Sequence, residues 1–252
     1  MKIHVLLSPL NVDDLYFTGK TSVVIDVLRA TTTIITALHH EAREVIPVNT
    51  IEFAMKVSGN AFGGQTLLGG ERNTKMIEGF TLGNSPTEYA TDSISGKSII
   101  LYTTNGSKAI VRAKFSENLF IACFNNLRAV GEHLANLGND VEILCAGANG
   151  MFCIEDSVCA GRLIDEIKIF RQDLELTDAA KSCVVLSETI GTDIYKMLSE
   201  SEHGQLLIKN GFEEDISYCA VLNNLNTVGS FKIGVIKKIV TADPEQNVEN
   251  YS

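Results

Sequence analysis

Residues 22–33 read SVVIDVLRATTT, an apolar run that ends near Asp26 and is followed by three threonines. The run Ser22–Val27 is nearly all apolar, which is typical of a strand buried on both faces of a parallel sheet. An ionised aspartate is costly inside such a run unless it has a partner or a task. The segment therefore predicts a strand, a short loop carrying Asp26 and Arg29, and a helix over residues 31–40.

The residue types of this first loop suit an anion or a cation site. Asp26 can bind a hard cation or act as a nucleophile. Arg29 offers a planar fork that fits phosphate, sulfonate or carboxylate groups. The hydroxyls of Thr31 and Thr32, with the free N–H groups of a helix N-terminus, favour anion binding. The alternative is structural: a threonine caps the helix and Asp26 closes a turn.

The same strand–loop–helix pattern occurs twice more, over residues 99–110 and 142–156. Apolar strands that alternate with helices predict a mainly parallel sheet, with some mixing allowed, covered on both faces. The loops at the carboxyl ends of such strands are where ligands bind. We expect one α/β domain over residues 1–252, with room for two subdomains, and a frayed tail at 243–252.

A glycine-rich stretch over residues 69–85 is predicted to be a long loop, and long loops in compact domains are usually functional or disordered. Glu71 and Arg72 suit a metal ligand beside an anion clamp, although a surface ion pair explains them nearly as well. Asn84 and Ser85 close the loop as further anion contacts. Ser85, Pro86 and Glu88 also form the pattern of a capped helix start.

The two later loops add further candidates. Hydroxyl, amide and glycine groups at the start of a helix make an anion cradle, although an Asn-Gly pair alone is more often a simple turn. Glu155 and Asp156 can complete an oxygen-ligand Mg²⁺ site, although acidic residues also favour a helix start without any function. The cradle residues are Thr103, Thr104, Asn105 and Gly106.

Composition narrows the class of protein. The chain has a formal net charge of −10, which disfavours nucleic-acid binding. No stretch is long and apolar enough to predict a membrane span, and no secretion signal is recognisable, so a cytoplasmic protein is expected. The six cysteines form no metal-binding pattern and are expected to be dispensable for chemistry. The five histidines are assigned to solvated positions without a catalytic role, and Asp215 to a helix cap.

Taken together, DVLRATTT, GGERNTKMIEGFTLGNSP, TTNGSKA and AGANGMFCIEDSVCAGRLI resemble the 2-phosphosulfolactate phosphatase family of coenzyme M biosynthesis. The resemblance runs in order from about residue 3 to residue 240. It implies a three-layer α/β/α fold that is not of the haloacid-dehalogenase type. Although Asp26 stands where that other fold carries the first aspartate of its D-x-D motif, Leu28 replaces the second.

The resemblance also implies Mg²⁺-dependent hydrolysis of 2-phospho-3-sulfolactate, or a related small anionic hydroxy-acid phosphate, to sulfolactate and phosphate. Asp26, Arg29 and Arg72 are then the expected catalytic residues, and the metal ligands are drawn from Asp26, Glu71, Glu155 and Asp156. We expect direct attack by water, with an aspartyl-phosphate on Asp26 as the mechanistic alternative. A non-catalytic sensor or carrier of sulfonates or phosphorylated acids is the alternative function. Homo-oligomers are compatible with the sequence.

Overall fold

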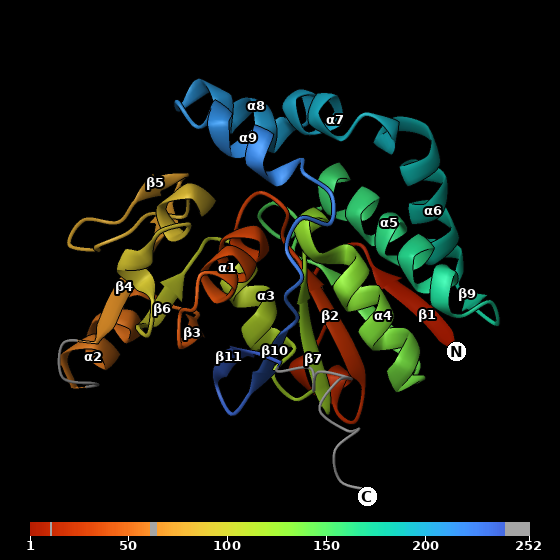
Figure 1. The fold of residues 1–252 in the computed structure, drawn as a ribbon, viewed down its shortest axis with the longest axis horizontal. Helices are drawn as coiled ribbons and strands as arrows, with labels where there is room; N and C mark the ends of the chain where they lie inside the picture. The colour runs from red at the N-terminus through yellow and green to blue at the C-terminus, as the bar shows by residue number, and fades with distance from the viewer. Residues whose placement is uncertain (11, 61–64, 240–252) are drawn as a thin grey trace, which may run out of the picture.

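In a computed structural model, residues 1–10, 12–60 and 65–239 are described, without the side chains of residues 59 and 60. Strands and helices alternate along most of the chain (Figure 1). The strands are β1 (Lys2–Leu6), β2 (Thr21–Ile25), β3 (Glu44–Val48), β4 (Thr66–Arg72), β5 (Lys75–Met76), β6 (Ser98–Tyr102), β7 (Asn118–Ala122), β8 (Val141–Cys145), β9 (Glu175–Leu176), β10 (Gly229–Lys232) and β11 (Val235–Lys238). The helices are α1 (Ala30–His39), α2 (Ile51–Asn60), α3 (Gly106–Arg112), α4 (Leu127–Leu137), α5 (Ile154–Phe170), α6 (Asp178–Thr189), α7 (Ile194–Glu200), α8 (Glu202–Lys209) and α9 (Glu213–Cys219).

One mixed sheet organises the molecule. Its strand order is β5-β4-β6-β3-β11-β10-β7-β2-β8-β1-β9. The strands β4, β6 and β3 are mutually parallel, and so are β7, β2, β8 and β1. The antiparallel hairpin β10–β11 lies between these two groups. The predicted α/β class and mainly parallel sheet are therefore confirmed.

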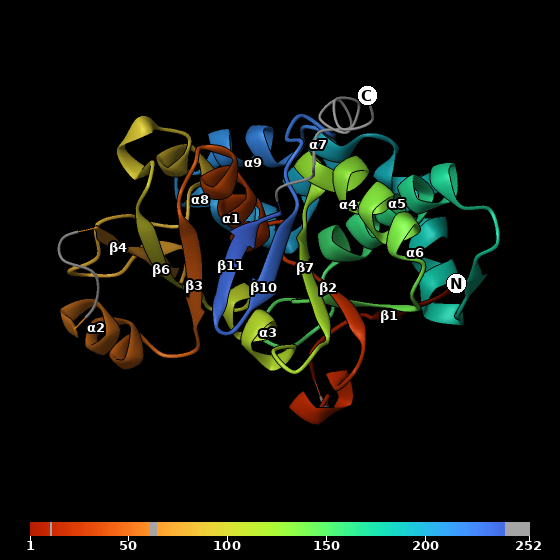
Figure 2. The same cartoon turned by 60° about the horizontal axis from the view of Figure 1, so that its bottom comes forward.

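The central hairpin reverses the hydrogen-bonded direction between the two parallel groups. Adjacent strands are rotated by roughly 20–25°, so the five steps from β6 to β2 accumulate a turn of roughly 100–125°. This twist takes the two groups far from a simple antiparallel arrangement, as the different strand directions in Figure 2 show. The carboxyl ends of β2, β4 and β6 meet. The backbone N–H of Thr104, just after β6, donates to Glu71 at the end of β4, and Gly106 at the start of α3 lies against Asp26, just after β2.

Helices cover both faces of the sheet. On one face, Val23 and Ile25 of β2 pack in a single cluster with residues of α4, α5 and α6. The alternate residue, Val24, belongs to a central cluster that includes α1 and α3 and also Ile99 and Leu101 of β6. The other face of β6 packs on α2. Because side chains alternate along a strand, the central cluster and the other two clusters lie on opposite faces of the sheet. The three layers are therefore the sheet, the helices α1 and α3 on one face, and the helices α2, α4, α5 and α6 on the other.

One expectation about local structure is wrong. The glycine-rich stretch is not a structureless loop, since β4 extends to Arg72 and turns into β5. This short antiparallel hairpin carries too few residues for its alternation to be visible in the sequence. The predicted frayed tail, 243–252, lies outside the described residues. No helix in the described ranges is long and apolar enough to cross a membrane.

The contact between α5 and α6 depends on Gly161. A Cβ at this position would overlap the main-chain carbonyl oxygen of Cys183 on α6. We predict that Gly161→Ala lowers the free energy of unfolding by about 1–3 kcal/mol, although alanine is the better helix former by about 1 kcal/mol. Urea unfolding measures this change. The exposed Ser182→Ala is the matched control on α6, and a Gly161→Ala protein as stable as that control would contradict the close packing.

Candidate active site

Asp26 lies directly after β2, and its loop is held by a threonine. The Thr31 hydroxyl donates to the Asp26 carbonyl oxygen at 2.8 Å and accepts from the Asp26 N–H at 3.0 Å. The Thr32 hydroxyl donates to the Val27 carbonyl oxygen at 2.9 Å. Both hydroxyls predicted to bind substrate close the loop here, and neither caps α1, whose N-cap position is Arg29 without a side-chain cap hydrogen bond.

The Asp26 carboxylate itself is only lightly engaged. Its Oδ1 accepts one long hydrogen bond, 3.3 Å, from the N–H of Ala30. None of the described residues donates a hydrogen bond to Oδ2. The start of α3 lies against this oxygen, since a Cβ on Gly106 would overlap it. Gly106 therefore lets α3 approach the carboxylate, a steric role rather than the predicted anion contact.

Asp156 and Glu71 are tied down more firmly. The two oxygens of Asp156 accept from the N–H groups of Val27 and Gly147, each at 2.9 Å. The two oxygens of Glu71 accept from the N–H groups of Thr104 at 2.7 Å and Thr74 at 2.9 Å. The first two bonds join the loops after β2 and β8, and the other two join the β4–β5 turn to the loop after β6. The N–H of Asn149 donates to Asn105 Oδ1 at 3.0 Å and joins the loops after β8 and β6. The convergence of the three strand–loop–helix repeats, predicted from the sequence, is therefore confirmed.

Burial and mutual repulsion raise the pKa values of these carboxyl groups. Desolvation raises the pKa of Asp26 well above its usual range, and the neighbouring Asp156 raises it further. Desolvation and Asp156 raise the pKa of Glu155 to about 7. For Asp156, desolvation also raises the pKa, against the lowering effect of its backbone hydrogen bonds. Binding of a cation or uptake of protons would therefore reduce the repulsion among these carboxyl groups.

The four carboxylates do not form one ligand set. Among the described residues, no group of three or more His, Cys, Asp or Glu side chains is placed to hold a metal ion together. The prediction that the metal ligands are drawn from Asp26, Glu71, Glu155 and Asp156 stays a prediction. Oxygen donors remain at Asp26 Oδ2 and at Asn84 Oδ1, which is buried without a hydrogen-bond partner. This donor chemistry fits Mg²⁺, which takes oxygen ligands and keeps several waters.

Arg29 is buried rather than exposed. Its guanidinium donates to Asp215 Oδ2 at 2.6 Å and to the Thr74 carbonyl oxygen at 2.8 Å. The ring of Phe212 lies 4.2 Å from its central carbon. Asp215 also accepts from the Ser85 hydroxyl at 2.5 Å. Asp215 is thus the buried partner of Arg29, not simply a helix cap, and Ser85 supports that pair instead of capping a helix.

Several predicted and unpredicted residues share one small pocket. Its cavity volume is about 10 Å³, close to the space that one water molecule needs. Arg72, at the end of β4, is exposed and is not among the lining residues. His203 and Thr74 were missed, because nothing local in the sequence connects α8 or the hairpin turn to the loop after β2. The lining residues are Asp26, Leu28, Arg29, Glu71, Thr74, Asn84, Thr103, Asn105 and His203.

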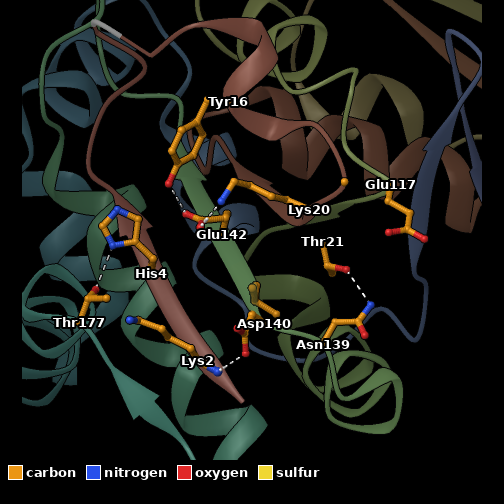
Figure 3. A pocket seen from close by; sticks show the side chains of 12 residues that line it. Lys2, His4, Tyr16, Lys20, Thr21, Glu117, Asn139, Asp140, Glu142 and Thr177 are labelled. Carbon is orange, nitrogen blue, oxygen red and sulfur yellow. Dashed lines mark hydrogen bonds and ion pairs between the residues drawn. The ribbon is translucent and has the colours of Figure 1, made fainter.

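A much larger pocket lies at the amino ends of β1, β2 and β8, the opposite edge of this group of strands (Figure 3). Its cavity volume is about 700 Å³. It contains none of the predicted site residues. Lys20 inside it pairs with Glu142 at 3.1 Å, and Lys2 pairs with Glu175 at 3.3 Å. Several of its polar side chains thus already have partners, and we assign the active site to the smaller pocket at the carboxyl ends, which contains Asp26 and Arg29.

The surroundings of the cysteines do not favour the thiolate form. Five of the six are buried, and Cys153 is half-buried. Burial raises the pKa of each of these thiols, so they are held as thiols and not as nucleophilic thiolates. Their predicted dispensability for chemistry stays a prediction.

Comparison with known proteins shows which family the chain belongs to. The model of the 2-phosphosulpholactate phosphatase family matches residues 9–234. The chain belongs to this family. It is 43% identical over 86% of its length to a probable 2-phosphosulfolactate phosphatase from Thermotoga petrophila, covering 91% of that protein. Its identity to the probable phosphatase of the same name from Clostridium beijerinckii is 36%, over 94% of this chain and 99% of that protein. The predicted phosphoric monoester hydrolase is confirmed at this level.

The first prediction from the site separates its two arginines. Arg29→Lys keeps the charge but loses the fork that reaches both Asp215 and Thr74, so we expect the free energy of unfolding to fall by about 1–3 kcal/mol. The exposed Arg72→Lys should change it by less than about 0.5 kcal/mol. Urea unfolding of both variants is the measurement. Equal stability of the two would show that the buried ion pair does not form.

The second prediction from the site concerns how Glu155 makes the free energy of unfolding depend on pH. The folded pKa of about 7 lies above the ordinary 4.5, so the folded state holds this proton more tightly than the unfolded state. That favourable contribution is complete below about pH 4.5 and is lost as the pH rises through 7. Glu155→Gln should therefore raise the free energy of unfolding at pH 8 by about 1–3 kcal/mol more than it does at pH 5.

The measurement is urea unfolding at both pH values with a chelator present, so that no cation compensates the carboxylate. The exposed Glu175→Gln serves as the control. A Glu155→Gln effect that is identical at pH 5 and pH 8 would contradict the raised pKa.

Proposed function

We propose that the chain is a Mg²⁺-dependent phosphatase that hydrolyses 2-phospho-3-sulfolactate, or a closely related 2-hydroxy-acid phosphate, to sulfolactate and phosphate. The observation that carries this proposal is the Asp26 carboxylate, which is buried, has an unused oxygen and faces a pocket shared with Arg29. Family membership supports the reaction class. The predicted cytoplasmic location and the role in coenzyme M biosynthesis stay predictions.

Different residues of the pocket would bind the cation and the phosphate. Asp26 Oδ2 and Asn84 Oδ1 are the groups that would hold Mg²⁺, with Glu71 close enough to raise the Asp26 pKa through its charge. When bound, the ion neutralises phosphate charge and makes an attacking water more acidic. Arg29 adds a fixed cation beside the phosphate, and burial strengthens its electrostatic effect.

Hydrolysis then follows from the position of these groups. The oxygen of a water molecule forms a bond to phosphorus as the bond from phosphorus to the C2 oxygen breaks. The electron pair of the broken bond stays on the C2 oxygen, which takes up a proton and becomes the hydroxyl of the product. Direct water attack leaves Asp26 unmodified, whereas the alternative forms and then hydrolyses an aspartyl-phosphate on Asp26.

Asp26→Asn tests the proposal. We expect phosphate release to fall by at least about a thousandfold, because a neutral amide binds a cation much more weakly than a carboxylate does and cannot act as a nucleophile. Folding should survive, since the change removes a buried charge whose pKa is raised by burial. The measurements are phosphate release with Mg²⁺, with a chelator and after Mg²⁺ is restored, together with a melting temperature. Full activity in the chelator would contradict the metal dependence.

The same assay separates the enzyme from a non-catalytic sensor. A sensor would bind 2-phospho-3-sulfolactate in calorimetry and release no phosphate over hours with Mg²⁺ present. Full turnover by a well-folded Asp26→Asn protein would also overturn the assignment of the pocket.

A further inference from the structure

A second pocket adjoins the active site along the wall formed by residues 103–105. Its cavity volume is about 350 Å³, far larger than that of the active-site pocket. Asn105 lines both. One side of it is a face of α3, and the other is made by residues 9–10 and by the loop after β8. The lining residues are Pro9, Leu10, Thr104, Asn105, Lys108, Ala109, Arg112, Ala146, Asn149 and Gly150.

The face of α3 that forms this pocket carries two cations. Asn105, Lys108, Ala109 and Arg112 follow the spacing i, i+3, i+4 and i+7, which places them on one side of a helix. Arg112 is engaged in structure: its guanidinium donates to the carbonyl oxygens of Pro9 at 2.7 Å and Val12 at 3.1 Å. Arg112 therefore fixes the opposite wall of the pocket.

Lys108 is differently placed. Its side chain is exposed, and its ammonium lies 5.7 Å from the centre of the Tyr102 ring. No carboxylate among the described residues pairs with it. In a chain of net charge −10, a lysine beside a pocket and free of an acidic partner leaves local positive charge available to a ligand.

The wall shared by the two pockets also holds an unused hydroxyl. Thr104 Oγ1 is buried and has no hydrogen-bond partner among the described residues. The Thr104 N–H, by contrast, donates to Glu71 in the active site at 2.7 Å. A buried hydroxyl without a partner is costly, and an oxyanion in the larger pocket, which Thr104 lines, would satisfy it once the side chain turns toward the pocket.

The active-site pocket is too small for the whole substrate, which indicates that the substrate extends into the larger pocket. A cavity volume of about 10 Å³ cannot hold a hydroxy acid together with its phosphate. Arg29, the cation of the small pocket, is paired with Asp215 and is assigned to the phosphate, so it is not available to a further anion. The carboxylate and sulfonate that accompany the phosphate therefore need both space and positive charge elsewhere, and the adjoining pocket supplies both.

We propose that the pocket on α3 is an oxyanion subsite, in which Lys108 and Thr104 bind a non-reacting sulfonate or carboxylate of the substrate. The inference rests on the proposed function, because it takes the phosphate to lie beside Asp26. Lys108 is then a specificity-determining residue: it binds the part of the substrate that is not transformed, and it selects phosphate esters that carry a further anionic group.

Lys108→Gln tests this assignment against Lys56→Gln, which removes the same charge from an exposed position on α2. With 2-phospho-3-sulfolactate, we expect the KM of Lys108→Gln to rise about tenfold while kcat stays near the wild-type value. Thr104→Val, which removes the hydroxyl but keeps the shape, should shift KM in the same direction. Lys56→Gln should leave both constants within about twofold.

A second substrate identifies the group that Lys108 binds. The compound 2-phospholactate keeps the carboxylate and phosphate but lacks the sulfonate. If Lys108 binds the sulfonate, its substitution should leave the KM for 2-phospholactate unchanged. If it binds the carboxylate, the KM for both substrates should rise equally. Wild-type KM values for both substrates in Lys108→Gln would overturn the subsite.

Calorimetry with sulfolactate separates this proposal from the proposed function. Sulfolactate carries the non-reacting anions without the phosphate, so its binding needs no turnover. We expect its Kd to rise about tenfold in Lys108→Gln, even if the wild-type protein releases no phosphate. Binding that is unaffected by Lys108→Gln, or no binding to the wild-type protein, would overturn the subsite whatever the outcome of the phosphatase assay.

Discussion

The buried ion pair between Arg29 and Asp215 is the interaction on which the arrangement of the site depends. Both residues are 2% exposed. Taking two charges out of water is expensive, and attraction offsets that cost only when the geometry is good and the remaining hydrogen-bonding capacity is used. Here the guanidinium also reaches the Thr74 carbonyl oxygen, and the carboxylate also accepts from Ser85. The pair therefore joins the first loop, the β4–β5 hairpin, the segment before residue 86 and α9.

A second constraint is the negative charge of the buried carboxylates in the same site. The fold compensates Glu71 and Asp156 with two backbone N–H donors each, whereas Asp26 receives a single long hydrogen bond. The carboxylate with the weakest support is thus the one that faces the pocket. Such unequal compensation is typical of active sites, where one group must stay available to a ligand while its neighbours hold the framework.

Much of this organisation could be predicted from the sequence, because its causes are local. Near-continuous apolar runs mark the central strands, and the polar residues after them mark the edge where Asp26, Glu71 and Asp156 meet. Contacts between distant segments could not be predicted in this way. Asp215 is 186 residues from Arg29, and no spacing rule connects them. Arg29 and Arg72 looked equivalent in the sequence, since each was expected on a loop, and only the packing of α9 over the first loop distinguishes the buried one.

The position of the β10–β11 hairpin has a consequence for how the chain is assembled. It is the last pair of strands along the described chain, yet it occupies the middle of the sheet, between β3 and β7. During synthesis from the amino terminus, the two parallel groups cannot be joined until residues near 238 have left the ribosome. Until then β3 and β7 each present an unpaired edge, the kind of surface that invites pairing with other chains. The step that completes the sheet is thus also the one that removes this exposure.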